Sequence, residues 1–486
     1  MQKTIHIIGA GTAGIACAMQ AAKRNVKVIV YEKAAEVGGT LYITAGHLSA
    51  ANTNYQQSKS IVDSVEQHYQ DIVRISRNTM DEAIAKKAVE LAPITLNWLD
   101  NLGYPFHEKT PMIIHGHEPY SVARTYFGVN DVTPAIDKPG RTILKLLLPY
   151  FNDLVKERKI ELHLNTALEK FQKIEDRITS IHFKNLETKA TLQQSIMPND
   201  KIVLCAGGYA ANPSLFNEIA STQNHQSQRL ISTAKETSTG DGIIAAMQIG
   251  AAFHGGEKHS STLGGIEFEP NSGRTNFWKA WARVSNGVDR KQREIYVNDC
   301  GLRFMNEFDL NADERERIVL QQPNQRFWIL FDDVALKDGA SLIPQFSVED
   351  IIKESKNEKA IWQANTIEEL CYKTKLPFDC VQQTIKQYNH AVMLKNDAAF
   401  NRTYLAHSIT QPPYYAVLCY AYSLISFGGL KVNNQLQVVQ QNNLPIENLF
   451  AAGEILGAAA TSGHAFCGGM LLTPAISFGK WLGETL

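Results

Sequence analysis

The sequence predicts an α/β protein in which a nucleotide-binding domain is divided along the chain by an inserted α+β domain. Three observations lead to this fold class. Residues 4–32 read as strand, glycine turn, helix and strand. Residues 255–409 instead mix strands with charged helices, as in QRFWILFDD and SVEDIIKESKNEKAIW. Apolar strands and glycine turns then return, so we expect the nucleotide-binding domain to comprise residues 1–254 and 410–486.

The composition of the 486 residues is that of a globular protein, with 44% hydrophobic and 20% charged residues. The net charge of -1 and the scattered Lys and Arg argue against nucleic acid as a partner. The seven cysteines form no CxxC pair, which argues against a disulfide scaffold, a zinc ribbon or c-type haem. The N-terminal MQKTIHIIGAG leads directly into a strand, and no apolar stretch reaches the ~18 residues of a membrane span. We therefore expect a cytoplasmic protein without a signal peptide, a membrane span or a bound metal.

The N-terminal glycines have the spacing G-x-G-x-x-G, at Gly9, Gly11 and Gly14, between two β-branched strands. The first glycine of this spacing makes a tight turn, the second lets a pyrophosphate approach the backbone, and the third lets helix and strand touch. Glu32 closes the second strand, where a carboxylate can accept hydrogen bonds from ribose hydroxyls. A glycine turn without a ligand is the alternative, but it does not account for a complete βαβ unit ending in an acid.

Further glycine-rich stretches follow in the order expected of one large cofactor site. The chain contains YEKAAEVGGT, TAGHLSA, DKIVLCAGG, STGDGI, GLRFMNE, FGGLKVN and ENLFAAGEILG, and then a glycine-rich helix start at residues 461–483. With these motifs the whole chain resembles the FAD-dependent fumarate reductase/succinate dehydrogenase flavoprotein family, and within it the 3-ketosteroid dehydrogenase-like branch. The resemblance implies a discontinuous Rossmann-type FAD-binding domain and an inserted capping domain at residues 255–409. The capping domain is expected to cover the flavin and to form the substrate site together with the FAD-binding domain.

The resemblance also assigns cofactor-binding positions. The final helix is expected to point its N-terminus at the flavin, where backbone amides and the helix dipole favour negative charge. Thr40 falls where some relatives carry a flavin-linking His, so we expect non-covalent FAD, with His47 a packed or surface residue. The expected FAD-binding residues are Gly9, Gly11, Ala13, Gly14, Glu32, Lys33, Gly39, Thr40, Ala45, Gly46, Ala206, Gly207, Asp241, Glu454, Gly469, Met470 and Leu471.

The substrate chemistry implied by the resemblance is hydride transfer between the flavin and one carbon of a C=C bond, with proton transfer at the neighbouring carbon. Dicarboxylate reducers of this family use cations, but the corresponding positions here are Asn311, Ile425 and Phe466. The ketosteroid dehydrogenases carry a Tyr where this chain has Phe466, and another Tyr where it has Leu310. The match to either catalytic set is therefore partial.

Catalytic candidates remain in the loop at residues 107–140, in FWKAWARVS and around the late glycines. Each aromatic candidate has core packing as its alternative, and each Arg has a surface ion pair. A Tyr or His could take the α-proton, and an Arg or Tyr could polarise the carbonyl. The candidates are Tyr126, Arg124, Tyr422, His464 and Arg283, with Tyr120, Trp278 and Trp281 nearby in sequence.

We expect an FAD-dependent oxidoreductase that desaturates or reduces a C–C bond next to a carbonyl in an apolar or cyclic ketone or keto acid. A second hypothesis is a reductase of a small unsaturated carboxylic acid that uses Arg124 or Arg283 in a different clamp. A third is a non-catalytic flavin-binding protein. Because the chain has no haem or iron–sulfur ligand set, the expected partners are a small-molecule substrate and an external electron donor or acceptor.

Overall fold

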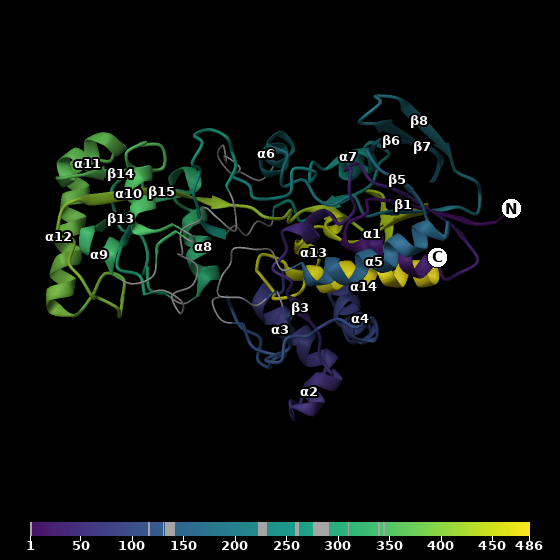
Figure 1. The fold of residues 1–486 in the computed structure, drawn as a ribbon, viewed down its shortest axis with the longest axis horizontal. Helices are drawn as coiled ribbons and strands as arrows, with labels where there is room; N and C mark the ends of the chain where they lie inside the picture. The colour runs from purple at the N-terminus through teal and green to yellow at the C-terminus, as the bar shows by residue number, and fades with distance from the viewer. Residues whose placement is uncertain are drawn as a thin grey trace.

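A six-stranded sheet lies in the half of the molecule that holds both ends of the chain (Figure 1). Its strand order is β17-β18-β9-β1-β2-β5. In this computed structural model the described residues are 2–114, 117–129, 131, 141–221, 231–257, 262–275, 291–309, 311–338, 341–343 and 346–486. The strands of the sheet are β1 (Thr4–Ile8), β2 (Lys27–Tyr31), β5 (Glu161–His163), β9 (Lys201–Leu204), β17 (Gln437–Val439) and β18 (Pro445–Ala451). All neighbours pair in parallel except β17 and β18. The carboxyl ends of the parallel strands therefore meet at one edge, where ligands of such sheets bind.

The βαβ unit predicted for residues 4–32 is confirmed. Helix α1 (Thr12–Ala21) begins directly at the glycine turn. Every residue of α1 is buried, which its small side chains allow. Helix α14 (Leu472–Thr485) packs along α1, with α4 (Glu82–Asn101) on its far side, so that the two ends of the chain form one layer.

Other helices and two small sheets surround this layer. A three-stranded antiparallel sheet packs against β18 and α7. Its strands are β6 (Thr166–Ile174), β7 (Arg177–Asn185) and β8 (Thr191–Ser195). The remaining elements of this half are α2 (Asn54–Ser58), α3 (Val65–Ser76), α5 (Thr142–Lys156), α6 (Pro213–Ser221), α7 (Asp241–Gln248), α13 (Ala459–Ser462), and the pairs β3 (Leu48–Ser49) with β4 (Thr125–Tyr126) and β10 (Phe253–His254) with β16 (Gly429–Leu430).

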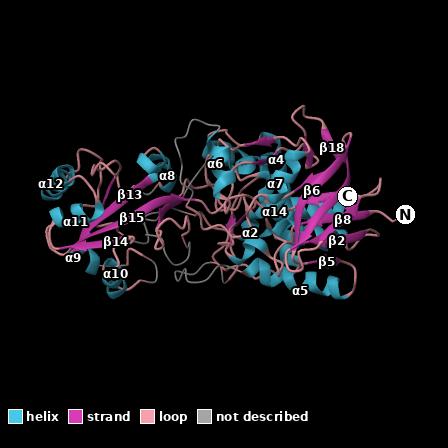
Figure 2. Ribbon diagram, turned by 90° about the horizontal axis from the view of Figure 1, so that it is seen from above, coloured by secondary structure: helices cyan, strands magenta, loops and turns pink. Residues whose placement is uncertain are grey.

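The inserted domain has a separate sheet at the opposite end of the molecule (Figure 2). Its strands are β11 (Thr262–Gly265), β12 (Ile295–Val297), β13 (Arg326–Asp332), β14 (Ile361–Ala364) and β15 (Tyr414–Tyr422). Its helices are α8 (Ala312–Leu320), α9 (Asp333–Lys337), α10 (Val348–Ser355), α11 (Ile367–Thr374) and α12 (Phe378–Leu394). Two apolar clusters pack on this sheet, apart from the cluster of the first half.

The boundary at which the chain re-enters the nucleotide-binding domain lies later than the predicted residue 410, because β15 belongs to the inserted domain. This strand pairs with β11, β13 and β14, and therefore belongs to the inserted domain up to Tyr422. This boundary could not be predicted from the sequence, because an apolar strand has the same pattern of residues in either sheet. The predicted architecture of a split α/β domain with an inserted α+β domain is confirmed.

Candidate active site

A cavity of about 400 Å³ lies at the carboxyl edge of the six-stranded sheet. Its walls come from the first glycine turn, the end of β2, the segment after β9 and the residues on both sides of α13. Thr262 and Glu316 of the inserted domain also line it. The cavity therefore lies where the two domains meet, which is a usual position for an active site.

The three glycines of the first turn differ in their surroundings. A Cβ on Gly14 would come within 1.9 Å of the Gly9 carbonyl oxygen, and one on Gly9 within 2.3 Å of the Cys205 carbonyl oxygen. At Gly11 the nearest atom would be the Cα of Gly39, 4.0 Å away. Gly9 and Gly14 thus serve the packing of the turn, whereas Gly11 faces open space at the start of α1. A pyrophosphate fits there, against the positive end of the helix.

The adenosine end of the expected cofactor meets a buried carboxylate and an ion pair. Glu32 accepts hydrogen bonds from the backbone N–H groups of Ala10 (2.7 Å) and Ala34 (2.8 Å), one on each oxygen. These bonds fix the carboxylate at the cavity wall, where its remaining lone pairs suit ribose hydroxyls. Lys33 lies next to it and pairs with Asp241 at 2.7 Å.

Glu454 is another carboxylate of the cavity wall. Its Oε1 accepts a hydrogen bond from the backbone N–H of Ser426 at 2.9 Å. Burial raises the pKa of Glu454 to about 7, although its bonds with Ser426 act in the opposite direction. A buried carboxyl facing a polar ligand is suited to a hydroxyl-bearing chain such as the ribityl group.

The N-terminal end of α14 opens onto the same cavity. Gly469 adopts φ +80°, and a Cβ there would come within 2.5 Å of the backbone nitrogen of Ser49. The residues Gly469, Met470 and Leu471 all line the cavity immediately before α14 begins. The positive end of this helix therefore faces the cavity, as the sequence predicted.

The expected FAD-binding residues line this one cavity, with the exceptions of Gly14 and Gly46. Gly14 acts behind the wall, in the contact with Gly9. A Cβ on Gly46 (φ +79°) would meet the carboxylate of Asp131 at 2.5 Å, so this glycine gives room to a neighbouring loop. The residues present fit FAD, because glycines with free space in front of them, an acid suited to ribose and a helix N-terminus all border this cavity.

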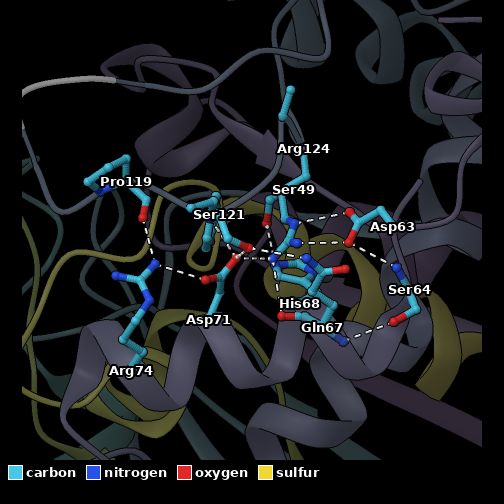
Figure 3. A network of polar contacts seen from close by, with 12 residues as sticks. Ser49, Asp63, Ser64, Gln67, His68, Asp71, Arg74, Pro119, Ser121 and Arg124 are labelled. Atoms are coloured by element: carbon cyan, nitrogen blue, oxygen red, sulfur yellow. Dashed lines mark hydrogen bonds and ion pairs between the residues drawn. The ribbon is translucent and has the colours of Figure 1, made fainter. Parts of the chain in front are cut away.

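The predicted catalytic residue Arg124 does not reach the cavity. Its guanidinium is fully buried between α3 and its own loop, where it pairs with Asp63 (2.8 Å) and Asp71 (2.8 Å), as Figure 3 shows. Asp71 also accepts bonds from Arg74 and from Ser121. Arg124 thus holds the loop at residues 117–129 against α3.

The other catalytic candidates that the structure describes do not line the cavity either. Tyr126 is buried and shares a hydrogen bond with Thr53. Tyr422 is buried at the end of β15, against Gly265. His464 is exposed, and its backbone N–H donates to Thr79. Tyr120 is buried and donates to the Gly468 carbonyl, whereas Arg283, Trp278, Trp281 and Leu310 lie outside the described residues.

The inserted domain meets the cavity at α8, where Asp313 and Glu316 were not singled out from the sequence. Nδ1 of His117 lies 2.9 Å from Oδ1 of Asp313, and the backbone N–H of Glu118 donates to Oδ2 of Asp313 at 2.7 Å. The ring of Phe466 lies 4.4 Å from that of His117, between their centroids. His117, Glu316 and Phe466 line the cavity together. No motif marks this group in the sequence, because its members come from three distant segments.

The pKa values of the two histidines of the wall are shifted in opposite directions. Burial, and then the nearby His117, lower the pKa of His47 to about 4, so this ring is neutral. Burial alone would lower the pKa of His117, but the hydrogen bond and charge of Asp313 outweigh it and raise this pKa. Ligand atoms of His117, Asp313 and Glu316 lie within 4.8 Å of one another, and the direct bond between His117 and Asp313 accounts for the closeness of the first two.

The sequence of this chain is similar to a known protein family and to several known proteins. The family described as "FAD binding domain" matches residues 5–471. A probable fumarate reductase of Shewanella frigidimarina is 25% identical over 484 residues, which are 99% of this chain and 74% of that protein. A vinyl phenol reductase of Lactiplantibacillus plantarum is 26% identical over 480 residues, which are 95% of this chain and 91% of that protein.

A solved structure with a similar fold is the 3-ketosteroid Δ1-dehydrogenase from Sterolibacterium denitrificans. It has a TM-score of 0.76 and 20% identity, and the match covers 99% of each chain. The fold expected from the resemblance is therefore confirmed. Among the helices that the structure describes, none has both the length and the apolar character needed to cross a bilayer.

Proposed function

The chain belongs to the FAD binding domain family. We propose that its substrate is an apolar or cyclic ketone or keto acid. The chain is an FAD-dependent oxidoreductase that acts on CH–CH groups. In this proposal it desaturates, or forms by reduction, the C–C bond next to the substrate carbonyl. When it is bound, FAD would be the acceptor or the donor of the hydride.

The observation that carries this proposal is the charge of the described cavity wall. Its basic residues are Lys33, His47 and His117. Lys33 is paired with Asp241 at the adenosine end, His47 is neutral, and His117 is paired with Asp313. A dicarboxylate needs at least two converging cations, because burying an unpaired carboxylate is costly. This wall suits a neutral carbonyl compound better.

The apolar lining supports the same substrate class. Leu424, Ile425, Phe427, Phe466 and Leu471 line the cavity. Ile425 and Phe466 stand at two of the positions where dicarboxylate reducers would carry cations. The name of one relative, a vinyl phenol reductase, is in keeping with an apolar substrate that lacks a carboxylate, although a vinyl phenol also lacks the carbonyl group of the proposed class.

The second candidate function is reduction of a small unsaturated carboxylic acid, which the name of the fumarate reductase relative favours. Arg124 is a poor clamp for that substrate, because Asp63 and Asp71 already pair with its buried guanidinium. The clamp would then rest on Arg283, outside the described residues. The third hypothesis, a non-catalytic flavin-binding protein, predicts bound FAD that no substrate oxidises or reduces.

We also propose that FAD is held without a covalent bond and that the protein acts in the cytoplasm with an external electron carrier. Thr40 stands at the position of the flavin-linking His of some relatives. His47 packs edge-on against the ring of Phe127, with 4.6 Å between centroids. Acid precipitation of the holoenzyme tests the attachment, since non-covalent FAD stays in the supernatant and covalent FAD stays in the pellet.

The test of the substrate class uses the anaerobic holoenzyme. Dithionite-reduced enzyme is mixed with neutral enones (cyclohexenone and benzalacetone) or with unsaturated acids (fumarate and cinnamate), and the oxidised flavin band is followed. Oxidised enzyme is mixed with saturated cyclic ketones and 3-ketosteroids in the reverse assay. Flavin reoxidation by the enones, or bleaching by the ketones, supports the proposal. Reoxidation by the acids alone contradicts it in favour of the second function, and no change in any mixture favours the third.

A further inference from the structure

We infer that His117 is the residue that gives the proton to, or takes it from, the substrate carbon next to the carbonyl, and that Asp313 positions it. This inference rests on the proposed function, because it assigns a proton-transfer group to the same cavity. At the position of the proton-donating Arg of dicarboxylate reducers, Asn311 instead caps α8 by accepting from the Glu314 backbone N–H at 3.2 Å. The next residues of α8 supply Asp313.

The hydrogen bonds fix which ring nitrogen faces the substrate. Nδ1 of His117 is occupied by Oδ1 of Asp313 at 2.9 Å. Nε2 is therefore the nitrogen left for proton exchange at the cavity. Asp313 is 3% exposed, and its second oxygen accepts from the Glu118 backbone, so it cannot turn away from the ring without breaking that bond. A carboxylate that holds one nitrogen of a histidine is a recurring way to set its tautomer and orientation.

The aromatic neighbour of His117 restrains the ring as well. Phe466 lies 4.4 Å from His117 at an interplanar angle of 36°. Phe466 precedes the Gly468–Gly469 pair that leads into α14, and so belongs to the segment expected to contact the flavin. The imidazole is held between α8 of the inserted domain and this segment.

The charged groups around His117 favour its protonated form. From α8, Asp313 and Glu316 raise the pKa of His117, and Arg315 acts against them. From the opposite wall the ring of His47 is neutral at pH 7. A protonated His117 can act as the acid in the direction of reduction, and its neutral form can act as the base in the direction of desaturation.

The proton-transfer pair is formed by both domains. His117 belongs to the loop between α4 and α5, whereas Asp313 belongs to the inserted domain. Next to them, Arg77 pairs with Glu314 at 2.5 Å across the same boundary. The pair is complete only when the inserted domain is docked as in this structure, so the acid is oriented when the cavity is covered.

In the direction of reduction, His117 gives its Nε2 proton to the α-carbon, and the π bond between the α- and β-carbons breaks to supply the electron pair of this C–H bond. FAD, when bound and reduced, would supply the hydride for the new C–H bond at the β-carbon. The ring of His117 is left neutral until solvent reprotonates it. An external two-electron donor, dithionite in the test, would return the cofactor to its reduced form.

The test compares H117Q and D313N with the control E314Q in the full-length holoenzyme. Gln in place of His117 keeps a hydrogen-bond donor but does not titrate. E314Q removes the neighbouring cross-domain carboxylate without touching His117. Each reduced enzyme is mixed with the member of the enone and acid panel that oxidises wild type fastest, and in parallel with ferricyanide, which needs no proton transfer to carbon.

We expect H117Q to slow C=C reduction by about 100-fold or more, while ferricyanide reoxidation stays within about twofold. The wild-type rate should fall as pH rises through a pKa above 6.5, and D313N should move this fall to lower pH. E314Q should behave like wild type. Equal rates of C=C reduction in H117Q and wild type, or equal slowing with ferricyanide, would overturn the inference.

The experiment distinguishes a wrong substrate class from a wrong role for His117. If only fumarate or cinnamate oxidises the reduced wild type, the proposed substrate class is wrong and the His117 comparison is made with that acid. If no compound reacts, the pKa of the His117 imidazole tests the proposed pair with Asp313. This pKa is measured by NMR of ¹⁵N-histidine-labelled holoenzyme, with H117Q as the assignment control. A pKa of 6.5 or below in wild type, or one unchanged in D313N, then rejects the pair.

Discussion

Gly479 on α14 lies directly against the backbone of Ala13 on α1, so closely that a Cβ on the glycine would come within 2.1 Å of the Ala13 carbonyl oxygen. One turn later, Gly483 stands in the same relation to Cys17, at 2.3 Å. The glycines of FGKWLG therefore let two helices touch through their backbones. Because both helices begin at the cavity, this contact fixes the expected pyrophosphate site relative to the expected flavin site.

The substitution G479A should destabilise the protein by about 1–3 kcal/mol, because the new methyl group forces α14 away from α1. Thermal unfolding followed by circular dichroism measures this effect. The control is G468A, whose Cβ would meet its nearest atom at 3.5 Å, which is an ordinary contact. Equal melting temperatures for the two variants would show that the helices adjust without cost.

The substitutions G11A and G14A should separate cofactor binding from folding. Gly11 has φ -83° and open space in front of it, so alanine is tolerated in the apoprotein but projects into the FAD site. We expect FAD affinity to fall at least about tenfold, ~1.4 kcal/mol, with little change in apoprotein stability. G14A should instead impair folding itself, because its Cβ would lie 1.9 Å from the Gly9 carbonyl oxygen. Isothermal titration with FAD and apoprotein melting curves distinguish the two outcomes.

The substitution R124M should destabilise the protein by about 3–5 kcal/mol, because it leaves the buried carboxylate of Asp63 without its cation and Asp71 with Arg74 alone. R74M is the matched control. Arg74 pairs with the same Asp71 but is 45% exposed, so the loss should be ~1 kcal/mol or less. Urea unfolding measures both. A stable R124M that has lost catalysis alone would return Arg124 to the catalytic candidates.

The stability of the apoprotein should depend on pH through Glu454. Its pKa is raised from 4.5 to about 7 by burial, so the folded state binds more protons than the unfolded state between these values. Stability therefore falls as pH rises from about 4.5 to 7 and is level above pH 7, with a total change of about 3 kcal/mol. E454Q should lack this part of the profile, which melting temperatures across pH 4–9 would show. A pH profile shared by both proteins would mean that the carboxyl is already ionised at low pH.

The sequence predicted the parts of the site that depend on local spacing. Gly9, Gly11 and Glu32 are set by one βαβ unit, whose geometry follows from strand and helix periods alone. The pair of His117 and Asp313 lies 196 residues apart in two domains. No period or spacing connects such residues, and only the docking of α8 against the loop brings them together.

Arg124 shows a different limit of sequence reasoning. An arginine in a long aromatic loop looks like a substrate ligand, and its acidic partners look like solvent-exposed charges of α3 and the preceding loop. Asp63 is fully buried in the structure, and Asp71 lies on the buried face of α3. The pairing depends on how the loop folds back, which the order of residues does not reveal.

The strand order of the central sheet also bears on how the protein is made. β1 and β9 leave the ribosome early, but β18, which pairs with β9, follows only after about 240 further residues. At about 5–20 residues per second this is a delay of roughly 10–50 seconds. The inserted domain, whose sheet uses neighbouring segments, is synthesised complete during that interval. The nascent N-terminal half thus waits with an open strand edge, and the cofactor cavity is the last part of the molecule to close.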